Sequence, residues 1–124
     1  MSDAARLFET PAGVVLGPVE QIAPDAARSF VVQLKAGRFH GFVVRRGEEV
    51  FGYLDRCPHM GLPLAKTLDE YLAPTGDLVL CSWHAALFEP ETGLCVGGPC
   101  KGARLARWPV HRCEGLIVTG DHSA

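Results

Sequence analysis

Two short stretches of the sequence, "RCPHMGL" at residues 56–62 and "CSWHAAL" at residues 81–87, decide how the rest of the chain is interpreted. Each places a cysteine ahead of a histidine, which gives the candidate ligands Cys57, His59, Cys81 and His84. Two thiolates with two imidazoles suit a tetrahedral zinc ion or an iron–sulfur cluster with mixed ligands. A zinc finger takes its cysteines from one turn and its histidines from another, whereas here each stretch supplies one of each. The spacing therefore favours a binuclear centre with two cysteines on one iron and two histidines on the other, and zinc stays open as an alternative.

The composition is that of a single globular domain over residues 1–124, long enough to bury a core without disulfide bonds. The 14 glycines and 9 prolines indicate many turns between short strands. A net charge of -2 offers no basic surface, so no nucleic-acid partner is expected. The sequence shows no signal-peptide pattern and no apolar run of about 20 residues, so we expect a cytoplasmic protein with no membrane contact. In that reducing compartment the five cysteines are expected to be metal ligands or buried thiols.

Runs rich in valine and aromatic residues predict an all-β fold. An antiparallel meander is expected first, at residues 29–34, 39–46 and 49–54. Further strands are expected at residues 77–81, at 86–96 as a pair around a turn at 90–93, at 103–110 and at 115–120. Residues 64–73 predict one short helix, because their leucines are spaced by four and Pro74 follows. Both Cys/His stretches fall where a strand ends, so they could meet at one end of a β-sandwich or small barrel.

These stretches resemble the two cluster-binding loops of Rieske 2Fe-2S proteins. The resemblance continues through "CPHMGLPL" and "CSWHAALFEPETGLCVGGP" to the Gly98-Pro99 pair, where the family places a proline-containing loop over the cluster, and it covers residues 28–120. It implies a Rieske-like antiparallel β-sandwich with a small cluster-binding subdomain at one end, with cluster-binding loops at residues 56–64 and 81–100. We expect residues 1–10 and 120–124 to be flexible.

The resemblance also implies one 2Fe-2S cluster, bound by the four candidate ligands, with the two histidines facing solvent or a partner. Leu62 and Trp83 stand where the respiratory Rieske proteins carry a cysteine pair, so the chain resembles the ferredoxin type instead. Ala86 and Phe88 stand where high-potential members carry a serine and a tyrosine that donate hydrogen bonds to sulfur atoms. The stretch between the loops is long for a small Rieske ferredoxin, with "DEYLAPTG" at residues 69–76 as the expected insertion. The residues expected around the ligands are Met60, Leu62, Trp83, Ala86, Phe88, Gly98 and Pro99.

The function implied is that of a soluble one-electron carrier, similar to the ferredoxin component of bacterial ring-hydroxylating dioxygenase systems. It would pass electrons from a flavin-containing reductase to a terminal oxygenase or another redox protein, and no catalytic centre of its own is expected. Two alternatives stay open: an accessory subunit of a larger oxidoreductase, of the nitrite reductase small-subunit type, and a zinc-stabilised binding module. Cys95, Cys100 and Cys113 are expected to be packed thiols rather than ligands, and a Cys95–Cys100 disulfide is left undecided.

Overall fold

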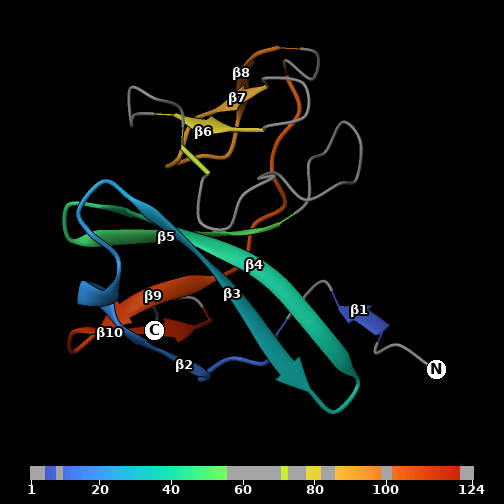
Figure 1. The fold of residues 1–124 in the computed structure, drawn as a ribbon, viewed down its shortest axis with the longest axis vertical. Coiled ribbons are helices and arrows are strands. Elements are labelled where there is room, and N and C mark those ends of the chain that lie inside the picture. The colour runs from blue at the N-terminus through green and yellow to red at the C-terminus, as the bar shows by residue number, and fades with distance from the viewer. Residues whose placement is uncertain are drawn as a thin grey trace.

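The computed structural model describes residues 5–7, 10–55, 71–72, 78–81, 86–98 and 102–120, which form short strands and one turn of 3-10 helix (Figure 1). The elements in chain order are β1 (Ala5–Leu7), β2 (Val15–Pro18), η1 (Val19–Gln21), β3 (Ala27–Leu34), β4 (Gly37–Arg46), β5 (Glu49–Leu54), β6 (Val79–Leu80), β7 (Leu87–Phe88), β8 (Cys95–Gly97), β9 (Val110–Cys113) and β10 (Leu116–Thr119). The expected all-β class is confirmed. Among the described residues, no helix is long and apolar enough to cross a membrane.

The predicted meander is present as β3, β4 and β5, paired antiparallel in that order. Two smaller sheets lie on either side of it in Figure 1: β2, β10 and β9 below, and β6, β7 and β8 above. The predicted pair of strands around residues 90–93 is also confirmed, since β7 and β8 pair antiparallel and Gly93 N–H donates to Glu89 O at 2.7 Å. The meander is therefore the middle layer of the molecule.

Successive side chains of a strand point to opposite sides of a sheet, and β4 has buried side chains on both sides. Phe39 and Val43 of β4 face the β2–β10–β9 sheet, in a cluster with Trp108 and Ile117 that we call the lower core. Phe42 and Val44 face the other way and pack with residues of the β6–β7–β8 sheet. This upper core consists of Phe42, Val44, Tyr53, Tyr71, Val79, Cys81, Ala86, Phe88, Cys95 and Leu105.

Residues 103–108 do not form the strand expected at 103–110, because their hydrogen bonds go to two different sheets. The first half bonds to the β8 side, with Cys95 N–H donating to Ala103 O (2.8 Å) and Leu105 N–H to Gly93 O (2.9 Å). The second half bonds to β5, with Leu54 N–H donating to Ala106 O and Trp108 N–H to Gly52 O, both at 2.9 Å. This segment, which we call the strap, connects the upper sheet to the meander, and the regular strand begins only at Val110.

Two further expectations differ from the structure at the ends of elements. The helix expected at residues 64–73 does not extend to Leu72, which forms an antiparallel bridge with Val79; residues 64–70 and 73 lie outside the described residues. Within the segment expected to be flexible, residues 5–7 form β1. β1 pairs parallel to Gly37–Phe39 of β4. This part of the β4 edge is open because β5 pairs with β4 only from Gly41 onward.

Trp108 approaches two glycines of the meander closely, Gly41 of β4 and Gly52 of β5. Its ring lies 4.6 Å from that of Phe39 between centroids, and its indole N–H donates to Thr10 Oγ1 at 2.9 Å. A Cβ atom placed on Gly52 would lie 2.5 Å from Trp108 O and 2.9 Å from Val110 Cγ2, closer than real Cβ contacts allow. Glycine is therefore required at this position of β5 so that the strap can approach the strand.

We expect Gly52→Ala to lower the free energy of unfolding by about 2 kcal/mol, because the methyl group overpacks the contact with the strap backbone. Urea denaturation followed by circular dichroism measures the change. Gly97→Ala is the matched control, since a Cβ there would meet Leu87 Cδ1 at an ordinary 3.6 Å. Equal stabilities of the two variants would contradict the role given to Gly52.

Candidate metal centre

Of the four candidate ligands, the structure describes Cys81, which follows directly after β6 and is fully buried in the upper core. Cys57, His59 and His84 lie outside the described residues, as do Met60, Leu62, Trp83 and Pro99 of the expected neighbours. Ala86, Phe88 and Gly98 are described. For this reason no group of three possible metal ligands is found among the described residues. The described residues at the ends of the ligand-containing loops indicate where the site lies.

The second Cys/His stretch begins and ends at a closed hairpin. Val79 and Leu80 of β6 pair with Phe88 and Leu87 of β7, and Cys81 N–H donates to Ala86 O at 2.9 Å. The four residues between Cys81 and Ala86, which include His84, connect the two strands. The backbone thus holds Cys81 at the point where this loop starts.

The segment that contains the first Cys/His stretch, residues 56–70, is flanked by two residues that are linked to that hairpin. It leaves the meander at Asp55, after β5, and the described chain resumes at Tyr71. Tyr71 O–H donates to Asp55 Oδ2 at 2.8 Å, and Leu80 N–H donates to Tyr71 O at 2.8 Å. Tyr71 therefore links the two ends of residues 56–70 to the strand that leads into Cys81.

The Gly98-Pro99 pair starts from the same end of the upper sheet. Gly97 of β8 pairs with Leu87, the residue that follows Ala86, and Gly98 comes next. The turn at Pro90 lies at the opposite end of the β7–β8 hairpin. Three loops that the sequence singles out thus start at one end of the upper sheet and the meander.

The residues at the base of this end are apolar and dry. Cys81, Ala86 and Phe88 are all 0% exposed, and none of the three carries a hydroxyl group. A bound metal would stabilise the thiolate of Cys81 at this position. The donor set of two thiolates and two imidazoles, with Cys81 held at a loop base, fits a mixed-ligand 2Fe-2S cluster.

The remaining described cysteines behave differently from each other. Cys95 is buried in the upper core as expected, and its Sγ donates to Gly97 O at 3.1 Å. The expectation that Cys113 is a packed thiol is wrong: it is exposed at the last position of β9, before the turn at Glu114. Cys100 and its pairing lie outside the described residues.

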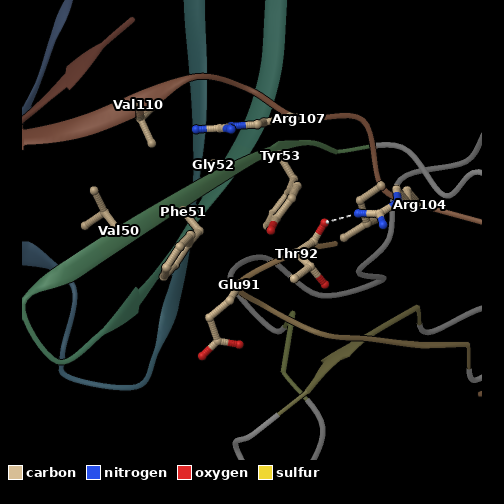
Figure 2. A pocket seen from close by; sticks show the side chains of 10 residues that line it. Val50, Phe51, Gly52, Tyr53, Glu91, Thr92, Arg104, Arg107 and Val110 are labelled. Atoms are coloured by element: carbon tan, nitrogen blue, oxygen red, sulfur yellow. Dashed lines mark hydrogen bonds between the residues drawn. The ribbon is translucent and has the colours of Figure 1, made fainter. Parts of the chain in front are cut away.

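A pocket of about 430 Å³ lies at the opposite end of the upper sheet from Cys81, between β5, the strap and the β7–β8 turn (Figure 2). Arg104 Nη1 donates to Thr92 O across it at 3.4 Å. Tyr53 O–H donates to Pro90 O at 2.6 Å, and burial raises the pKa of Tyr53 to about 12 against the opposing charges of Arg107 and Arg104. The described residues that line the pocket include no cysteine or histidine, so it is distinct from the candidate metal centre.

The sequence matches the Rieske 2Fe-2S domain family over residues 13–111. Among solved structures, the ferredoxin of carbazole 1,9a-dioxygenase from Nocardioides aromaticivorans IC177 is similar in fold, with a TM-score of 0.67, 18% identity, and coverage of 90% of this chain and 99% of that chain. A complex of reduced oxygenase and oxidized ferredoxin in carbazole 1,9a-dioxygenase gives a TM-score of 0.65 at 26% identity, over 90% of this chain and 95% of that chain. The terminal oxygenase of carbazole 1,9a-dioxygenase from Novosphingobium sp. KA1 gives 0.68 at 20% identity, over 94% of this chain and 31% of that chain. No match is found among curated proteins.

The raised pKa of Tyr53 predicts a loss of stability at alkaline pH. The pKa of the phenol has its ordinary value of 10.0 in the unfolded chain and is about 12 in the folded protein. The contribution of the Tyr53 hydroxyl to the free energy of unfolding is thus fully present below pH 10 and falls as the pH rises towards 12. We expect the difference in unfolding free energy between wild type and Tyr53→Phe to shrink over this range, as measured by urea denaturation at several pH values. A constant difference would contradict the assignment.

Proposed function

The chain belongs to the Rieske 2Fe-2S domain family, and from that premise we propose that it is a one-electron carrier, with no catalytic centre of its own, that passes electrons from a reductase to a terminal oxygenase. The observation that carries the proposal is the family match across residues 13–111, a range that includes both Cys/His stretches. Support for the ferredoxin type comes from the likeness to the ferredoxin of carbazole 1,9a-dioxygenase, which covers 99% of that chain.

In this proposal Cys57 and Cys81 hold one iron and His59 and His84 hold the other. The bound cluster supplies reversible one-electron chemistry. Support comes from the fixed position of Cys81 and from the shared origin of the loops that contain the other three ligands. Met60, Leu62, Trp83 and Pro99 would surround the ligands together with Ala86, Phe88 and Gly98, and would keep water from the sulfur atoms.

The proposed partners are a flavin-containing reductase as donor and a terminal oxygenase, or another redox protein, as acceptor. Support for an oxygenase comes from the similar complex of oxygenase and ferredoxin in carbazole 1,9a-dioxygenase. We place the protein in the cytoplasm, where a reductase fed by a nicotinamide cofactor would reach it.

The proposed function is tested on the purified protein by its visible absorption spectrum and by electron paramagnetic resonance after reduction with dithionite. Rieske-type visible absorbance that a reductase bleaches and an oxygenase restores, with a paramagnetic resonance signal in the reduced state, supports the carrier. A colourless protein with stoichiometric zinc identifies the zinc-stabilised module instead. A cluster that exchanges no electrons, in a chain that co-purifies with one large subunit, identifies the accessory subunit.

We expect Cys57→Ser, Cys81→Ser, His59→Ala and His84→Ala each to abolish the cluster, because each removes one of its four ligands. Assays of iron and acid-labile sulfide measure the loss. Cys95→Ser and Cys113→Ser are the matched controls and should keep the full iron content. Loss of iron in either control would show that the ligand set is wrong.

We expect a reduction potential at the low end of the Rieske range, nearer about -150 mV than +300 mV, because Ala86 and Phe88 offer no hydroxyl to the sulfur atoms. Ala86→Ser with Phe88→Tyr adds two donors, which stabilise the more negative reduced state. A gain of about 1 kcal/mol per donor corresponds to about 40 mV each, so we expect an upward shift of about 50 to 150 mV.

Protein-film voltammetry of both forms measures this shift. Phe88→Leu changes the same buried position without adding a hydroxyl, and it should stay close to the wild-type potential. A wild-type potential well above zero, or a double variant without an upward shift, would contradict this account.

A further inference from the structure

Tyr71 contacts the residue that precedes each Cys/His stretch. Its hydroxyl donates to Asp55 Oδ2 at 2.8 Å, at the start of the loop that contains Cys57. Its backbone carbonyl accepts from Leu80 N–H at 2.8 Å, one residue before Cys81. A single residue thus connects the origins of the two loops through one side-chain and one backbone hydrogen bond.

The ring of Tyr71 is itself held firmly. It is 2% exposed and stacks on Phe42 of β4, with ring centroids 4.3 Å apart and an interplanar angle of 6°. Its acceptor is fixed by the same strand, since Asp55 N–H donates to His40 O at 3.1 Å. The hydroxyl contact therefore joins two groups that β4 already positions, and the loop ends are fixed relative to the meander.

We propose that the Tyr71 hydroxyl is a positioning group for the metal centre, which holds the Cys57/His59 loop in place relative to Cys81. Tyr71 lies in residues 69–76, where the sequence predicts an insertion between the two loops. The inference rests on the proposed function, because it assigns a role to Tyr71 in retaining and tuning the cluster.

The chain offers a matched control in its other tyrosine. Tyr53 is also buried in the upper core and also donates a hydroxyl hydrogen bond, to Pro90 O at 2.6 Å, but at the opposite end of the β7–β8 hairpin. Tyr71→Phe and Tyr53→Phe remove the same atom from the same core. Only Tyr71→Phe should affect the metal centre.

Two readouts separate positioning from general destabilisation. The first is the rate at which the visible absorbance is lost to an iron chelator. It should rise at least about fivefold in Tyr71→Phe and stay within about twofold of wild type in Tyr53→Phe, because only the former frees a loop that holds ligands. The second is the reduction potential, which a purely structural defect would not move in a defined direction.

Tyr71→Phe should lower that potential, because the Asp55 carboxylate loses a donor that spreads its negative charge. We expect about a threefold fall in the equilibrium constant of reduction, which is about 28 mV at 59 mV per tenfold. Asp55→Ala removes the acceptor together with its charge, so it should speed chelation like Tyr71→Phe but raise the potential. The double variant should lose its cluster no faster than the faster single variant, because both changes break one contact.

The outcomes separate this inference from the proposed function. A wild type without a 2Fe-2S signal overturns both. A wild type with the signal, and a Tyr71→Phe variant that matches Tyr53→Phe in both readouts, overturns the positioning role alone. Where Tyr71→Phe fails to fold, Asp55→Ala decides: unchanged chelation overturns the inference, and faster chelation with a raised potential supports it.

Discussion

The packing of apolar side chains on both faces of β4 and β5 is the constraint on which the rest of the structure depends. Phe42 and Val43 are neighbours in one strand, yet each is 0% exposed, because one enters the upper core and the other the lower core. A strand whose two faces are both buried has its register strongly specified, since a slip by one residue would exchange the cores. The positions of the β2–β10–β9 sheet and of the candidate metal centre are therefore set by the same pairing.

The upper core connects this strand pairing to the candidate metal centre. Phe42 stacks on Tyr71 and lies 5.8 Å, between ring centroids, from Tyr53, so one side chain of β4 contacts residues at both ends of the upper part. The strap adds a second connection, because its hydrogen bonds pass from β8 to β5 within a few residues. The loops that contain the proposed ligands thus start from a base that is fixed on two sides.

The sequence predicts strand pairs that are joined by short turns, and it misses contacts between segments that are far apart in the chain. The meander and the β7–β8 hairpin follow from alternating apolar residues joined by turn residues, so their pairing was predictable. The strap resembles a strand in composition, but its partners lie in two sheets that only the tertiary structure brings together. Leu72 fits a leucine spacing of four, yet the bridge to Val79 overrides it. At the site, the motifs predict the ligand types and the loop positions, whereas the contact of Tyr71 with Asp55 spans 16 residues and has no motif.

The upper and lower parts of the molecule differ in what can stabilise them. The lower core packs Trp108, Phe39 and Ile117 between the meander, in which β3 has 8 residues and β4 has 10, and the four-residue strands of the β2–β10–β9 sheet. The upper sheet has strands of only two or three residues, and so short a sheet is marginal in water without further support. Part of that support comes from Phe42 and Val44 below it, and a bound cluster would supply the rest, because metal-binding free energy is folding free energy where ligands come from separate loops. Electron transfer and the order of the upper part would then depend on the same four ligands.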